Sequence, residues 1–175
     1  IVPMTVVADM LKPKKLMDRL VDFRGKKGLR IVYLAKAPRA ILHALKKHEA
    51  VGFLLDVGCQ RDGGIPVTFF GRRTMVPAGP ALLALRTGAP IVVGYGLVVG
   101  NRIEVHSYPP IFATSTGHKD DDARHCSQMI VQHFEDFIRR YPEQWYIYRP
   151  MWGPESAVPG QTEDASMPDP VSEAA

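Results

Sequence analysis

Three arginines surround the sequence Phe69-Phe70-Gly71 and could bind a phosphate group. Arg61 precedes this segment, and Arg72 and Arg73 follow it directly. Each guanidinium group presents a planar fork of N–H donors that matches the oxygens of a phosphate. The alternative is that the three side chains are solvated charges of exposed loops. Their clustering beside glycine-rich backbone favours the binding role.

Asp56 and Gly79 lie where α/β proteins commonly place ligands. Asp56 follows the buried run Val51–Leu55, and the carboxyl ends of such strands form the ligand-binding edge of a sheet. Its carboxylate could equally accept hydrogen bonds from its own loop. The turn before Gly79 begins a short helix, whose first N–H groups form an anion site. Pro80 removes one of these donors, and the same turn could simply reverse the chain.

The spacing of apolar residues predicts the elements that position these side chains. Short apolar or β-branched runs predict strands, and apolar residues at helical spacing predict helices between them. The predicted strands are residues 4–8, 29–34, 51–55 and 67–70, and the predicted helices begin at Pro13, Pro38 and Gly79. Because parallel strands need helix-length connections, this order predicts an α/β domain with a mixed, mainly parallel central sheet flanked by helices.

The later part of the chain predicts a basic loop, a hairpin and a long helix. The loop follows Gly71 and ends before the helix at Gly79. Residues 91–99 and 103–108 flank Gly100-Asn101, a dipeptide typical of a two-residue hairpin turn, which predicts an antiparallel edge on the sheet. Asp120–Asp122 begin an amphipathic helix, where negative charge complements the positive helix end.

Length and charge indicate one domain with anionic partners. The 175 residues carry 22 Lys and Arg and 18 Asp and Glu; five of the acids and none of the basic residues follow Gly153, so residues 1–153 carry +9. Such a charge favours lipid headgroups, nucleic acid or phosphorylated carriers, although it could equally serve solubility. No apolar run reaches the length of a membrane span. Residues 153–175 are predicted to be a disordered acidic tail.

Neither the cysteines nor the consecutive acids predict a metal. Cys59 and Cys126 lack metal-ligand spacing and are expected to be reduced thiols in the cytosol. Capping and the helix dipole explain Asp120–Asp122. We therefore expect no metal ion and no other cofactor.

Residues 51–95 resemble lipid A biosynthesis (lauroyl or myristoyl) acyltransferases and, more closely, phosphatidylinositol mannoside acyltransferases of the lysophospholipid acyltransferase superfamily. The resemblance rests on a strand ending in an acid, a glycine loop, FFG, a threonine, PAGPA and LA-x-RTGA: Asp56, Gly63-Gly64, Phe69–Gly71, Thr74, Pro77–Ala81 and Leu83–Ala89. It extends more weakly to Phe23-Arg24, Gly28, Ala44–Lys46 and Ile138–Trp145. Val57 departs from the Gln or Arg that often follows the strand acid.

The candidate substrate-binding residues are Asp56, Arg61, Arg72, Arg73, Thr74 and Gly79, and Thr74 belongs to this set through the resemblance alone. The resemblance also implies a glycerolipid acyltransferase-like fold over residues 1–152. The implied reaction moves a fatty acyl group from acyl coenzyme A or acyl-carrier protein to a hydroxyl of a glycolipid or phospholipid. The implied place is the cytoplasmic face of the cell membrane, with peripheral contact, and no nucleic acid takes part.

The family's catalytic motif, His-x-x-x-x-Asp or His-x-x-x-x-Glu, is missing from the chain. In this motif the imidazole removes a proton from the acceptor hydroxyl, and the carboxylate orients the imidazole. No acid stands five positions after any of the six histidines, His43, His48, His106, His118, His125 and His133. We expect a carboxyl-terminal part of an enzyme, truncated at the N-terminus, with the motif upstream of Ile1.

Two other functions remain open. A catalytically inactive family member could bind lipids or a protein partner, and the coding sequence upstream of Ile1 would distinguish it from the enzyme. A nucleotide-binding α/β domain is the second alternative. It would carry a glycine-rich phosphate loop after the first strand, which residues 8–13 do not provide.

The aromatic residues admit two interpretations each. Phe69 and Phe70 could line an acyl-chain channel, although core packing is more common for such a pair. The second aromatic group lies beside Arg139, Arg140 and Arg149 and suits either a membrane interface or an anchor for the last helix. Its members are Tyr141, Trp145, Tyr146, Tyr148 and Trp152.

Overall fold

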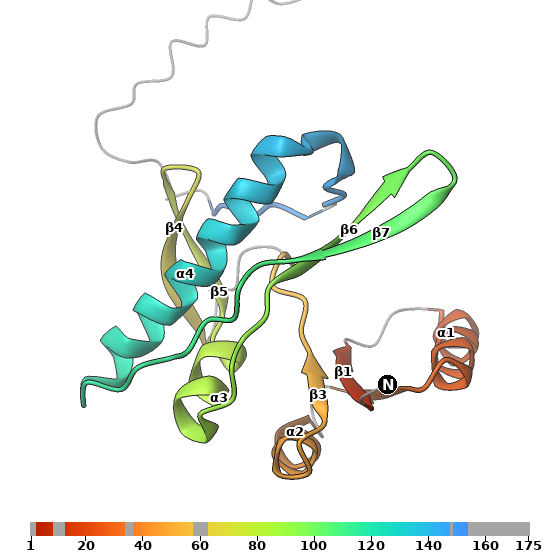
Figure 1. Cartoon of the computed structure of the whole chain (residues 1–175), viewed down its shortest axis with the longest axis horizontal. Coiled ribbons are helices and arrows are strands. Elements are labelled where there is room, and N and C mark those ends of the chain that lie inside the picture. Colours follow the sequence, from red (N-terminus) through yellow and green to blue (C-terminus); the bar gives the residue numbers. More distant parts are fainter. Residues whose placement is uncertain (1–2, 9–12, 34–36, 58–62, 148, 154–175) are drawn as a thin grey trace, which may run out of the picture.

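The computed structural model describes residues 3–8, 13–33, 37–57, 63–147 and 149–153. It begins with a β-α-β-α-β unit, seen at the lower right of Figure 1. The elements of this unit are β1 (Met4–Ala8), α1 (Lys14–Lys26), β2 (Leu29–Tyr33), α2 (Ala37–Lys46) and β3 (Ala50–Gly52).

The three strands of this unit form a parallel sheet in the order β2-β1-β3. Val6 in β1 is paired with Ile31 in β2 on one side and with Gly52 in β3 on the other. The chain therefore adds β2 on one side of β1 and then crosses back to add β3 on the other side. This reversal creates a topological switch point between β1 and β3, and α/β proteins bind ligands at the carboxyl ends of the strands that flank such a point.

The remaining elements form two hairpins and two helices. They are β4 (Gly64–Phe69), β5 (Arg72–Pro77), α3 (Gly79–Thr87), β6 (Gly94–Val99), β7 (Arg102–Ser107), α4 (Lys119–Arg140) and a 3-10 turn (Pro142–Gln144). Helix α4 crosses the β4–β5 hairpin, and the β6–β7 hairpin extends away from it (Figure 1).

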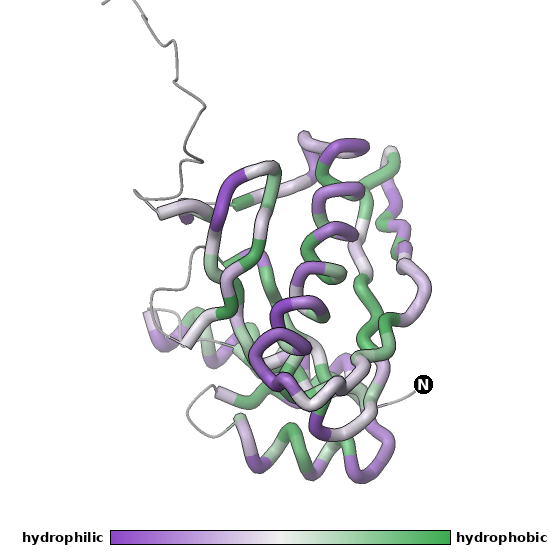
Figure 2. The backbone as a smooth tube through the Cα atoms, turned by 90° about the vertical axis from the view of Figure 1, so that its left-hand side faces the viewer, coloured by the Kyte–Doolittle hydropathy of each residue, from purple (hydrophilic) through white to green (hydrophobic). Residues whose placement is uncertain are grey.

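The main core lies between α4, α3 and the two hairpins. Its buried members include Phe69 of β4, Val76 of β5, Leu97 of β6 and Ile130 of α4. Helix α4 alternates between hydrophilic and hydrophobic residues along its length, as expected of a helix that buries one face (Figure 2). The Gln128 side chain also donates to the Thr68 carbonyl and accepts from the Thr68 N–H, each over 2.8 Å, and so attaches α4 to β4.

The α/β class, the parallel pairing and the helices agree with the sequence predictions, but the strands are arranged differently in two places. Residues 72–77 form β5 rather than a loop, because Thr74 and Val76 alternate inward with a period of two. Within the described residues, β6 and β7 pair only with each other, so the predicted antiparallel edge on the central sheet is wrong. The Gly100-Asn101 turn itself is confirmed.

Two further predictions concern membrane spans and the tail. No helix in the described part of the chain is both long and apolar enough to cross a bilayer. The predicted acidic tail lies almost entirely outside the described residues, and that prediction stays open.

Candidate functional site

A cavity of about 710 Å³ lies at the carboxyl side of the switch point. Val7 near the end of β1 and Phe53 directly after β3 both line it. Most of the wall is apolar and comes from α2 and α3, whereas the polar groups come from α3, the segment before α4 and the first turn of α4. The apolar wall includes Ala37, Pro38, Ile41, Leu82, Leu83 and Leu85, and the polar groups are Arg86, Ser115, Lys119 and Asp122.

A second, smaller cavity of about 250 Å³ shares Phe53 and Leu83 with the first. Its wall is almost wholly apolar. The other lining residues include Met4, Leu45, Leu55, Ile91, Ile130 and Phe134. Phe53 and Leu83 therefore separate two apolar spaces that lie next to each other.

Asp56 lies four residues beyond β3 and contacts the segment that follows α4. Its Oδ2 accepts a hydrogen bond of 3.2 Å from Nε1 of Trp145. The Trp145 ring also meets Phe69 edge-on, with 6.0 Å between ring centroids. A residue of the loop after β3 is thus held against the aromatic end of β4.

The hairpin of β4 and β5 positions Arg72, Arg73 and Thr74. The guanidinium of Arg72 lies 5.5 Å from the ring centroid of Trp152. Arg73 is exposed and pairs with Thr68 in the ladder. The buried hydroxyl of Thr74 donates to the main-chain carbonyl of Met151.

The predicted binding residues therefore fall into two groups. Asp56, Arg72 and Thr74 all contact the segment between residues 145 and 152. Gly79 instead lines the larger cavity, where a Cβ at its position would lie 3.6 Å from Cε1 of Phe53. Arg61 lies outside the described residues.

The turn between β4 and β5 is held in an unusual backbone conformation. Phe70 has a φ of 49° and Gly71 a φ of 75°. A positive φ is uncommon for a bulky side chain. The Phe70 N–H donates to Oε1 of Glu135 over 2.8 Å, and the guanidinium of Arg139 lies 5.0 Å from the Phe70 ring. Two residues of α4 thereby fix the turn.

Aromatic residues after α4 complete this region and anchor it to the core. Trp152 stacks on Phe69 with 5.6 Å between centroids, and its Nε1 donates to the Phe69 carbonyl over 3.1 Å. These contacts agree with the anchoring interpretation of Trp145 and Trp152. Phe69 is buried in the core, and Tyr148 lies outside the described residues.

Sequence reasoning missed several residues of the larger cavity. Phe53 and Leu82 were visible only as parts of a predicted strand and helix. Arg86 stands within the quoted LA-x-RTGA segment and could have been identified there. Lys119 carries no sequence signal, because only the fold brings the start of α4 next to α2 and α3.

None of the six histidines lines either cavity. Nε2 of His106 lies 3.5 Å from Oε2 of Glu104, but both side chains are exposed on β7. His133 stacks on Tyr108, with 4.3 Å between ring centroids. The Tyr108 hydroxyl donates to Asp136 over 2.6 Å, so the residue directly after β7 is attached to α4. Burial and this bond raise the pKa of Tyr108, and the same bond lowers the pKa of Asp136.

Asp122, in the first turn of α4, is held by hydrogen bonds from the loop before the helix. Oδ1 of Asp122 accepts from the Thr116 hydroxyl over 2.6 Å, and Oδ2 accepts from the Thr116 N–H over 2.9 Å. These bonds lower the pKa of Asp122. In the described ranges no cluster of three or more metal-ligating side chains occurs.

Comparison with known proteins identifies the chain's relatives. It is 31% identical over 153 residues to a phosphatidylinositol mannoside acyltransferase of Mycolicibacterium smegmatis, covering 86% of this chain and 49% of that protein. It is 29% identical over 151 residues to the Mycobacterium tuberculosis H37Rv protein of the same name, covering 85% of this chain and 46% of that protein. The chain thus spans about half the length of these relatives.

A family comparison matches nearly all of the described chain. The family model described as "Bacterial lipid A biosynthesis acyltransferase" matches residues 2–153. Since this match covers well over half of the chain, the protein belongs to the bacterial lipid A biosynthesis acyltransferase family.

Proposed function

We propose that the chain forms the lipid-binding part of an enzyme that moves a fatty acyl group from a thioester to a lipid hydroxyl. The large apolar cavity at the switch point carries this proposal. A hydrocarbon chain needs an apolar wall, which Ile41, Leu82 and Leu85 help to provide. Membership of the bacterial lipid A biosynthesis acyltransferase family supports acyl transfer as the reaction.

Two cations at the larger cavity suit the polar end of an acyl donor. Arg86 and Lys119 both line it. Coenzyme A and the prosthetic group of acyl-carrier protein carry phosphates, which Arg and Lys bind well. The acyl chain then lies between α2 and α3, with the thioester toward these two side chains.

The proposed acceptor is a membrane glycolipid of the phosphatidylinositol mannoside or lipid A type. The names of the relatives and of the family support this choice. Such an acceptor requires peripheral contact with the membrane, which we propose at its cytoplasmic face. The arginines beside Phe69-Phe70-Gly71 remain candidates for headgroup contact, Arg73 foremost because it is exposed.

The chain supplies the binding surface in this proposal, but not the catalytic base. Every histidine is described, and none lines either of the two cavities above. The same observation favours the second candidate function, a catalytically inactive family member that binds lipids or a protein partner. The coding sequence upstream of Ile1 separates the two: an intact His-x-x-x-x-Asp or His-x-x-x-x-Glu indicates the enzyme.

Binding of palmitoyl coenzyme A, followed by calorimetry, tests the proposal. Leu82→Lys places a charge in the larger cavity, and affinity is expected to fall about tenfold or more because an ion is costly in an apolar site. Leu54→Lys is the matched control, because Leu54 is 67% exposed and lines neither cavity. Equal binding by wild type and Leu82→Lys would refute the cavity assignment.

An acyl-transfer assay tests the proposal that the chain lacks the catalytic base. With palmitoyl coenzyme A and a phosphatidylinositol mannoside, the 175-residue chain alone is expected to show no turnover above background. Measured turnover would overturn the assignment of the base to a segment beyond this chain.

A further inference from the structure

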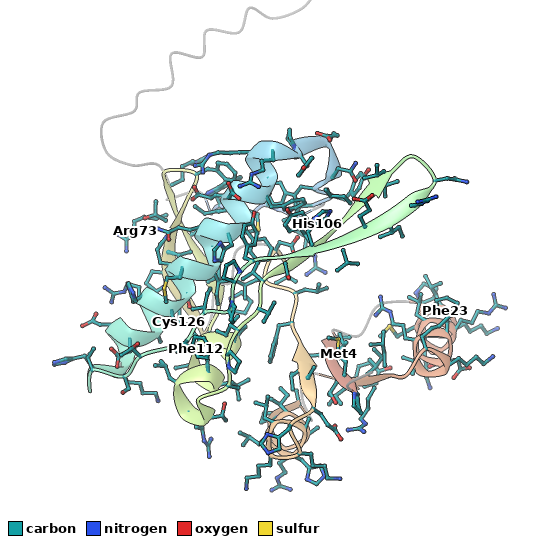
Figure 3. The ribbon with its side chains drawn as sticks, viewed as in Figure 1. Met4, Phe23, Arg73, His106, Phe112 and Cys126 are labelled. Atoms are coloured by element: carbon teal, nitrogen blue, oxygen red, sulfur yellow. The ribbon has the colours of Figure 1, made fainter. Side chains whose placement is uncertain are left out.

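Helix α1 carries an exposed apolar stripe on its outer side. Leu16, Leu20 and Phe23 stand at i, i+4 and i+7, which places them on one face of a helix. Leu16 is 51% exposed and Phe23 is 61% exposed, while Leu20 is half-buried. Figure 3 places Phe23 on α1 at the outer edge of the molecule. Large apolar side chains that gather on one exposed face mark an interaction surface.

A row of basic side chains runs beside this stripe. Lys15, Arg19 and Lys26 stand at i, i+4 and i+11, so they follow the helix along one flank. Arg19 is three residues from Leu16 and four from Phe23, so it neighbours both on the helix surface. All three basic residues are exposed. The ion pairs found in the described residues include none of them.

A different face of α1 provides the contact with the rest of the fold. Met17 is the buried residue of the helix, and α1 packs on β2. Within the described structure, the rest of the fold covers Met17, whereas Leu16 and Phe23 stay exposed. The helix has five basic and two acidic residues, a net charge of +3.

We infer that α1 docks the protein on the surface of an anionic phospholipid bilayer. A helix with an apolar stripe and a basic flank lies in the bilayer interface, its apolar side chains among the acyl chains and its cations at the headgroups. This inference rests on the proposed function, because an acceptor lipid in the membrane has to reach the binding site. Helix α1 follows β1 in the chain, and Val7 of β1 lines the larger cavity.

Sedimentation with lipid vesicles tests the inference on the 175-residue chain. Wild type is expected to bind vesicles of phosphatidylcholine and phosphatidylglycerol, to bind pure phosphatidylcholine vesicles far less, and to dissociate at high salt. The triple variant Lys15→Gln, Arg19→Gln, Lys26→Gln should lose affinity by a factor on the order of a hundred, because each cation near an anionic surface contributes about fivefold.

The apolar stripe is tested separately. Leu16→Ser, Phe23→Ser should weaken binding by about tenfold, since two partly exposed apolar side chains no longer enter the bilayer. The matched control is Ile103→Ser, Val105→Ser on β7, where Ile103 is 74% and Val105 is 82% exposed. This control should bind as wild type does. Circular dichroism of each variant checks that the helices are intact.

Three results would overturn the inference: no vesicle binding by wild type, equal binding to neutral and anionic vesicles, or equal losses in the α1 and β7 variants. The first would indicate that another protein segment covers α1. Failure of this inference can be distinguished from failure of the proposed function. Palmitoyl coenzyme A binding that depends on Leu82 would support the cavity even where α1 fails, and vesicle binding through α1 could stand where the cavity fails.

Discussion

The indole Nε1 of Trp145 donates a hydrogen bond to Oδ2 of Asp56, over 3.2 Å and between residues 89 positions apart. This bond connects the loop after β3 with the segment that follows α4. Trp145 also packs against Phe69, so its ring joins the loop to the main core. The carboxylate is therefore oriented by a side chain from the far end of the domain.

Trp145→Phe is expected to destabilise the protein by about 1 kcal/mol, because the donor is lost while most of the ring packing stays. Urea unfolding measures this change. Trp152→Phe is the matched control: it removes a donor to the uncharged Phe69 carbonyl, and bonds to charged groups are the stronger kind. The expected order is a larger loss for Trp145→Phe. A variant as stable as wild type would show that the bond contributes nothing.

The glycine at the β4–β5 turn gives a second prediction. Gly71→Ala is expected to destabilise the protein by about 1–2 kcal/mol, since φ is 75° and a Cβ disfavours that conformation. Gly25→Ala provides the contrast. Gly25 lies inside α1, and a Cβ there would have no other atom within 4 Å. Alanine at that position should stabilise by about 0.5–1 kcal/mol. Unfolding curves in which both variants shift the same way would contradict this account.

The sequence predicted the element types well because each depends on local spacing. The alternation of strands and amphipathic helices before Gly52, the hairpin turn at Gly100 and the long helix after Asp120 all agree with the structure. Strand β5 was missed because the charged pair Arg72-Arg73 is typical of a loop. Thr74 and Val76, two residues apart, both point inward as expected of a strand. The larger cavity could not be predicted, since Val7, Phe53 and Lys119 meet only in the folded chain.

The start of α4 gives a prediction about pH. Hydrogen bonds from Thr116 lower the pKa of Asp122 below its ordinary value of 3.8. A carboxyl group with a lowered folded pKa stabilises the protein fully above its unfolded pKa, and this contribution disappears as the pH falls through the folded value. Asp122→Asn should therefore lower the thermal midpoint at neutral pH, and the difference from wild type should shrink below about pH 4.

Asp120→Asn is the control for this pH dependence. Asp120 is exposed and lies in the same first turn, so the substitution removes the same charge from the helix start. It should change the midpoint less than Asp122→Asn does. A difference between Asp122→Asn and wild type that stays constant from neutral to acidic pH would show that the ionised carboxylate is not the stabilising form.

Phe53 predicts how the site limits the length of a bound hydrocarbon chain. Its side chain and Leu83 separate the larger cavity from the smaller one. Phe53→Ala removes most of this separation, so the two apolar spaces should join and accept a longer chain. Displacement of a fluorescent fatty acid by saturated fatty acids of increasing length measures the preference. The variant's best ligand is expected to be longer than that of wild type.

The neighbouring Leu54 supplies the control for this experiment. It is largely exposed and lines neither cavity, so Leu54→Ala should leave the length preference unchanged. Phe53→Ala will also lower stability, because removing a half-buried aromatic side chain costs about 3 kcal/mol or less. Chain-length preference is a ratio of affinities within one variant, and this loss affects all ligands alike. An unchanged ratio in Phe53→Ala would therefore show that the two cavities do not act as one space for a hydrocarbon chain.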